Sequence, residues 1–110
     1  MNEFRKLAGI LMIISAFTHV LQVFVYEETV SVYSAAIYGG VIYALIGIQT
    51  LKGNPIAFKA GIIFPLLGGI GGAYRALFSE DVLFPAFHVM IDCIVIPIFV
   101  YLVWFREESY

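Results

Sequence analysis

Apolar residues fill four long stretches of the chain, at residues 7–25, 30–51, 60–78 and 82–105. Each stretch is close to or above the roughly 20 apolar residues that a helix needs to cross a bilayer. Three short connections join them, at residues 26–29, 52–59 and 79–81. Connections of this length place successive helices side by side in opposite directions. The pattern therefore predicts one all-α domain over residues 1–110, an antiparallel four-helix transmembrane bundle.

Polar residues inside the spans recur at helical spacing, so that each predicted helix has one polar or small-residue face. The first span carries such a face at Ser15, Thr18, His19 and Gln22. In the second span Tyr38 stands beside two glycines, and in the fourth His88 and Asp92 lie one turn apart. Lipid penalises exposed polar groups, so we expect these faces to point into the bundle.

Composition agrees with a membrane protein and excludes several other classes. Hydrophobic residues make up 62% of the chain and charged residues 13%, whereas soluble domains average about 45–50% and about 25%. A soluble domain of this size could not bury so much apolar surface. The net charge of −2 and the lack of a basic run exclude a nucleic-acid binder. The single cysteine, Cys93, excludes an internal disulfide.

The charged residues near the ends of the spans predict the orientation in the membrane. One side of the predicted bundle holds the cations Arg5, Lys6, Lys52, Lys59 and Arg106. The other side holds one nearby cation, Arg75, and the acids Glu27, Glu28, Glu80 and Asp81. Connections rich in lysine and arginine stay in the cytoplasm. We therefore expect a multi-pass protein of the cell membrane with both termini cytoplasmic.

Ionisable residues within the spans are costly in lipid and indicate a functional site. Four of them stand out, namely His19, Arg75, His88 and Asp92. With a rise of about 1.5 Å per residue, all four fall in the outer half of the bundle, and Asp92 lies about 15 Å deep. A buried carboxylate needs a partner. We expect Asp92 to pair with Arg75 and, as a second partner, with His88.

These residues predict a polar pocket that opens outwards and binds a small amphipathic ligand, such as a lipid head, a quinone or an isoprenoid. The ligand-binding candidates are His19, Gln22, Tyr38, Arg75, His88 and Asp92. In this interpretation Arg75 anchors an anionic group, and Asp92 sets the charge state of Arg75 and His88. The histidines and Tyr38 supply hydrogen bonds. The predicted role is that of a binding protein or an accessory subunit.

Three other functions fit the same residues. In a membrane enzyme acting on a lipophilic substrate, His88 and Asp92 form an acid/base pair and His19 supplies a second proton transfer. Arg75 then stabilises developing negative charge. In a haem protein, His19 and His88 face each other as axial ligands. In a proton-coupled transporter, Asp92 carries the proton and a homodimer forms the path. A structural metal site is not predicted, because too few further ligands are present.

Glycines are concentrated in the third span, at Gly68, Gly69, Gly71 and Gly72, and include a GxxxG motif. Such stripes usually bring helices into close contact. The alternative is a flat-sided cavity, in which the missing side chains leave room for a ring or an acyl chain. The same stripe is a candidate surface for a homodimer.

The chain resembles a family of small four-helix bacterial membrane proteins of unknown function. The features shared with that family are Tyr38-Gly39-Gly40 on the second helix, the glycine-rich residues 68–75 ending in Arg75, and Asp92 within the fourth helix. The resemblance implies the fold and the importance of Arg75 and Asp92, and it implies no activity. The small multidrug transporters do not fit, because they carry a glutamate in their first helix and residues 7–25 contain no acid.

Overall fold

The computed structural model describes residues 2–26, 29–80 and 82–105. Every regular element in these ranges is helical, and none of them is a strand. Four of the charged residues used to predict the orientation lie outside the described residues, namely Glu27, Glu28, Asp81 and Arg106. The all-α class is therefore confirmed for the part of the chain that the structure describes.

The elements in chain order are α1 (Asn2–Val25), α2 (Val30–Ile37), η1 (Tyr38–Tyr43), α3 (Ala44–Leu51), α4 (Pro55–Phe78), α5 (Leu83–Val100) and η2 (Tyr101–Phe105). The two η elements are π-helices, and η1 joins α2 and α3 into one rod. Four rods result, and each contains a helix long and apolar enough to cross a membrane. The longest dimension of the molecule is 45 Å, which matches the thickness of a bilayer with its headgroups.

α4 begins at Pro55, earlier than the predicted start at residue 60. The side-chain oxygen of Asn54 accepts a hydrogen bond from the Ile56 N–H at 3.0 Å, which caps the helix. Pro55 suits the first helical position because its fixed φ angle is already helical. Gly53 makes the preceding turn with a φ of 81°, a conformation that favours glycine. The turn is therefore confined to residues 52–54.

The start of α5 is capped from another helix. Ser79 ends α4, where its N–H donates to the Arg75 carbonyl at 3.0 Å. Val82 precedes α5 and makes no side-chain capping bond. Instead, the Phe84 N–H donates to the hydroxyl oxygen of Tyr26, which follows α1, at 2.9 Å. A distant tyrosine thus satisfies one of the free N–H groups of this helix start.

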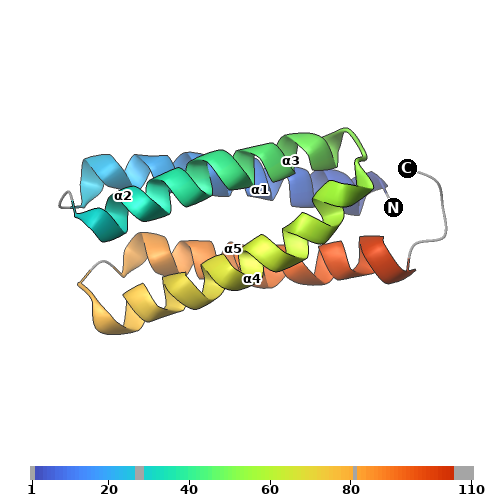
Figure 1. Ribbon diagram of the computed structural model, residues 1–110. Coiled ribbons are helices and arrows are strands. Elements are labelled where there is room, and N and C mark those ends of the chain that lie inside the picture. Colours follow the sequence, from blue (N-terminus) through green and yellow to red (C-terminus); the bar gives the residue numbers. More distant parts are fainter. Residues whose placement is uncertain (1, 27–28, 81, 106–110) are drawn as a thin grey trace.

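Figure 1 shows two pairs of rods lying against each other, α1 with α2–α3 and α4 with α5. α4 approaches α3 beside the link at residues 52–54. Toward its other end, α4 diverges from α2, and the two helices are well separated in the view. Only α2 and α4 separate toward this end, because α1 and α5 remain in contact there through Tyr26 and Phe84.

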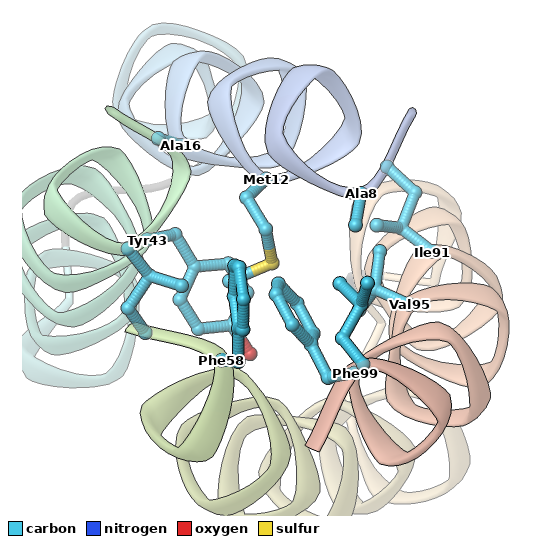
Figure 2. Close-up of a cluster of buried hydrophobic side chains, with 10 residues drawn as sticks. Ala8, Met12, Ala16, Tyr43, Phe58, Ile91, Val95 and Phe99 are labelled. Atoms are coloured by element: carbon cyan, nitrogen blue, oxygen red, sulfur yellow. The ribbon is translucent and has the colours of Figure 1, made fainter. Parts of the chain in front are cut away.

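The apolar core fills the closed part of the bundle. Figure 2 shows Met12 from α1, Tyr43 from η1, and Phe58 and Phe99 from α4 and α5 converging on the bundle axis. Each of these side chains has no exposed surface. Beyond this core, polar residues are buried as well. On α1 they are Ser15, His19 and Gln22, toward the helix end at residue 25, and on α5 they are Asp92 and His88, toward the helix start at residue 83.

The outer surface of the bundle is apolar. Phe17, Ile70 and Trp104 each expose 63–68% of their surface, and many other large apolar side chains are exposed with them. A soluble monomer rarely exposes apolar patches on this scale. The surface and the four long apolar helices are compatible with a multi-pass membrane protein.

Candidate functional site

The π-helix η1 brings two tyrosines onto one face of its rod. Residues five apart in an α-helix point about 140° away from each other, whereas a π-helix nearly aligns them. Tyr38 and Tyr43 are five apart, and both reach the same carbonyl oxygen of Phe64 on α4. The hydroxyl oxygens lie 2.8 Å and 3.4 Å from it. The wide turn thus points both hydroxyl groups at α4.

Two buried histidines stack face to face between α1 and α5. The ring centroids of His19 and His88 are 3.6 Å apart and the rings are tilted by 8°. Gly39 on η1 lies against the His19 ring: a Cβ atom at Gly39 would lie 2.0 Å from His19 Cγ. The stack therefore requires glycine at this position. The structure brings together the two histidines that the sequence places at equal depth.

Hydrogen bonds to α1 hold both rings. His19 Nδ1 donates to the backbone carbonyl of Ser15 at 2.7 Å. His88 Nε2 lies 2.7 Å from the hydroxyl oxygen of Thr18. The Thr18 hydroxyl is also 3.0 Å from the Ser15 carbonyl oxygen. One turn of α1 therefore orients both imidazoles.

Arg75 is anchored by Gln22. Its Nη1 atom donates to the Gln22 side-chain oxygen at 2.9 Å. Gln22 is fully buried, and its side-chain nitrogen has no hydrogen-bond partner among the described residues. Arg75 therefore points inward, as the stripe of small residues predicts.

Asp92 does not pair with Arg75 or with His88, so these expected contacts are wrong. The carboxylate is buried, with 2% of the residue exposed, and its Oδ1 atom accepts a hydrogen bond from the Tyr43 hydroxyl at 3.1 Å. Asp92 projects beside Gly69 of α4. The η1 turn supplies this partner, while Arg75 is held by Gln22 nearer the end of the bundle.

A cavity of about 390 Å³ lies beside the stacked histidines. His19, Tyr38, Arg75 and His88 line it together with glycines of α4. Its lining also includes exposed residues of α2 and α4, namely Ser34, Leu67, Gly71 and Tyr74. The mouth of the cavity thus lies between α2 and α4, on the side of the bundle, where these helices diverge (Figure 1).

A second, smaller cavity of about 240 Å³ lies along the outer face of α4 and α5. Asp92 and Cys93 line it with apolar residues of both helices. It shares no lining residue with the larger cavity. Asp92 is therefore separate from the site that contains the histidines and Arg75.

Of the six predicted ligand-binding residues, His19, Tyr38, Arg75 and His88 line the larger cavity. Gln22 does not line this cavity, but its side-chain oxygen accepts a hydrogen bond from Arg75, which does. Tyr43, which bonds to Asp92, is a residue of this region that is not among the six predicted. In a regular α-helix Tyr43, five residues after Tyr38, would point away from the face of Tyr38, so regular helical spacing does not predict its place in the site.

The stacked histidines do not fit a bis-histidine haem. Axial ligands approach the iron from opposite faces of the porphyrin with their nitrogen atoms pointing at each other. Here the ring faces of His19 and His88 touch, which leaves no space for a porphyrin between them. Among the described residues, no group of three or more histidine, cysteine, aspartate or glutamate side chains is placed to hold a metal ion.

If the larger cavity binds a ligand, as the sequence predicts, replacing Asp92 by asparagine is expected to leave that binding unchanged within about twofold. The asparagine oxygen still accepts the bond from Tyr43, and Asp92 does not line this cavity. Binding of dansyl-undecanoate, a fluorescent single-chain carboxylate, measures the effect. If Asp92→Asn abolishes binding, Asp92 belongs to the site after all. The enzyme and transporter hypotheses both predict instead that Asp92→Asn abolishes their activity.

Comparisons of the chain with protein-family models, with curated proteins and with solved structures give no match. The resemblance to the small four-helix bacterial family therefore stays a prediction. The geometry of the larger cavity is the basis for a functional assignment.

Proposed function

We propose that the chain is a multi-pass protein of the cell membrane whose four spans run antiparallel, with both termini in the cytoplasm. Arg5 supports this orientation, because its Nη1 atom donates to the carbonyl oxygens of Thr50, at 3.0 Å, and Leu51. Arg5 and Lys52 therefore lie at the same end of the bundle. A cluster of cations at one end favours placing that end in the cytoplasm. The histidines and Arg75 then lie toward the outer side.

Within this protein we infer a binding site for a small amphipathic ligand in the larger cavity. The observation that carries the proposal is the lining of this cavity, which combines Arg75, two histidines and Tyr38 with apolar residues such as Leu67 and Pro85. Pockets of about 300–1,000 Å³ with a few convergent polar groups are typical of ligand sites. An amphipathic ligand enters from the bilayer, places its polar head among these groups and leaves its chain in lipid.

Catalysis has weaker support than binding. The proposed acid/base pair needs His88 and Asp92 in contact, but His88 bonds to Thr18 and Asp92 bonds to Tyr43. A general base must lie within hydrogen-bond reach of its partner or substrate. We therefore propose a binding or accessory protein.

Filling the cavity from Gly71 tests this proposal. Gly71 lines the cavity, and a Cβ atom placed there meets no other atom within 4 Å. The Cβ of a Gly71→Trp side chain therefore displaces no neighbouring atom, and the indole beyond it can extend into the cavity. We expect wild-type protein in phosphatidylcholine nanodiscs to bind dansyl-undecanoate, and Gly71→Trp to bind it several-fold more weakly.

The matched control is Ile63→Trp on the same helix. Ile63 is 56% exposed and lines neither cavity, so an added indole there faces lipid. This variant is expected to bind the probe like the wild type. Equal binding by all three proteins contradicts a ligand site in the larger cavity.

A further inference from the structure

We propose that the ligand of the larger cavity is a single-chain anionic lipid with a free hydroxyl group between its charged head and its chain. Lysophosphatidic acid has this chemistry. The proposal rests on the proposed function and names the class of ligand. Two features of the site carry it: the order of the polar groups along the bundle axis, and the hydrogen-bonding character of the two imidazoles.

The order of the groups follows from α1. Arg75 bonds to Gln22, which lies three residues from the end of α1 at Val25. His19, with its partners in the stack, lies one turn further from that end, about 5 Å deeper in the bundle. The cation of the site is therefore nearer the membrane surface than the imidazoles. A lipid that enters with its head toward the surface places an anionic group at Arg75 and the next atoms of the ligand at the imidazoles.

The His19 ring offers the ligand a hydrogen-bond acceptor. Its Nδ1 atom lies 2.7 Å from the Ser15 carbonyl oxygen, and a carbonyl can only accept, so Nδ1 carries the hydrogen. Two imidazolium cations stacked at 3.6 Å would repel each other, and Arg75 lines the same cavity. Both residues are also buried, with 7% of His19 and 3% of His88 exposed, and burial disfavours a charge on either ring, so the neutral form of each ring is the most stable. Neutral His19 then has its lone pair on Nε2.

The His88 ring offers a second acceptor. The Thr18 hydroxyl lies 3.0 Å and 3.2 Å from the carbonyl oxygens of Ser15 and Ile14, in the preceding turn. Helical threonines donate their hydrogen to such carbonyls. Thr18 then accepts the hydrogen bond from His88 Nε2, and the lone pair of His88 lies on Nδ1. Within the described residues, neither this nitrogen nor Nε2 of His19 has a hydrogen-bond partner.

The cavity therefore presents a cation near the surface and two acceptors one turn deeper. A diacyl phospholipid places ester oxygens below its phosphate, and these only accept hydrogen bonds. A simple fatty acid places CH₂ groups there. A lysolipid places a hydroxyl group two carbons from the phosphate ester, and this hydroxyl can donate to either imidazole. Of these three lipids, only the lysolipid has both an anionic group for Arg75 and a hydroxyl group that can donate to the imidazole nitrogens.

The test compares lysophosphatidic acid with two ligands that each lack one of its polar groups, all bound to the protein in phosphatidylcholine nanodiscs. They are 1-oleoyl-lysophosphatidic acid, its 2-deoxy analogue without the hydroxyl, and mono-oleoylglycerol without the phosphate. Displacement of dansyl-undecanoate measures each affinity. We expect lysophosphatidic acid to bind about tenfold more tightly than the deoxy analogue, and mono-oleoylglycerol to bind more weakly still. Equal affinity for the first two ligands overturns the proposal.

The double variant His19→Phe/His88→Phe keeps two aromatic rings and removes both lone pairs. It is expected to bind lysophosphatidic acid and the deoxy analogue equally. If this variant does not fold, the comparison of lysophosphatidic acid with its deoxy analogue on wild-type protein still tests the proposal. Binding that Gly71→Trp blocks but that shows no preference for the hydroxyl refutes the ligand class and leaves the proposed function intact. Binding that Gly71→Trp does not affect refutes the proposed function itself.

Discussion

Replacing Gln22 by glutamate is expected to weaken binding of 1-oleoyl-lysophosphatidic acid by about a hundredfold, or about 2.8 kcal/mol. The Gln22 side-chain oxygen already accepts a hydrogen bond from Arg75 at 2.9 Å. A carboxylate at this position would form a charge-assisted pair with the guanidinium and neutralise it. The added negative charge beside Arg75 would therefore oppose binding of the anionic head. Gln22 does not line the cavity, so the shape of the site is unchanged.

Two controls separate this charge effect from a general one. Gln49→Glu makes the same substitution at the other end of the bundle, where the Gln49 side-chain oxygen accepts a hydrogen bond from Asn54. This variant is expected to bind lysophosphatidic acid like the wild type. Mono-oleoylglycerol, which has no charge, is expected to bind Gln22→Glu and wild-type protein equally. Unchanged affinity of Gln22→Glu for the anionic lipid would show that Arg75 does not bind the head.

Replacing Gly39 by alanine is expected to destabilise the bundle by about 2 kcal/mol, within the range of about 1–3 kcal/mol for overpacked sites. The new Cβ would lie 2.0 Å from His19 Cγ. The His19 ring cannot move away freely, because it stacks on His88 and its Nδ1 atom bonds to Ser15. Either the stack opens or η1 moves away from α1. The free energy of unfolding in mixed micelles titrated with SDS measures the loss.

Gly71→Ala is the matched control for Gly39→Ala. A Cβ at Gly71 meets nothing within 4 Å, and alanine favours a helix over glycine by about 1 kcal/mol. This variant is expected to be as stable as the wild type or slightly more stable. If both alanine variants have the same stability, the tight approach of η1 to His19 is not a feature of the folded protein.

Local patterns predict much of the fold. Apolar stretches of sufficient length locate the four rods, because a helix that crosses a bilayer needs a minimum number of apolar residues. The predicted start of α4 at residue 60 differs from the observed start at Pro55 for a local reason. Lys59 interrupts the apolar pattern, yet it is exposed and does not break the helix. The Asn54-Pro55 pair marks the true start, since asparagine caps helices and proline suits their first turn.

The candidate site was only partly predictable, because side-chain partners depend on contacts between distant residues. The equal depth of His19 and His88 on their two helices predicts that the two side chains lie close together, and their rings do stack. The partner of Asp92 depends on η1, whose extra-wide turn aims Tyr43 at the carboxylate. No simple rule of residue spacing reveals a π-helix. The capping of α5 by Tyr26 is likewise a contact between residues 58 positions apart.

The π-helix η1 also changes the rotational phase of its span. Over one wide turn the chain falls behind an uninterrupted α-helix by about one residue, or about 100° of rotation. Compared with an uninterrupted α-helix of the same residues, the face of α3 is therefore rotated by this angle relative to the face of α2. Deleting a single residue within Tyr38–Tyr43 and closing the wide turn to a regular α-helix would remove the same rotation that the wide turn removes now. The α3 face that holds Gly47 against Gly9 of α1 would therefore keep its orientation relative to α2.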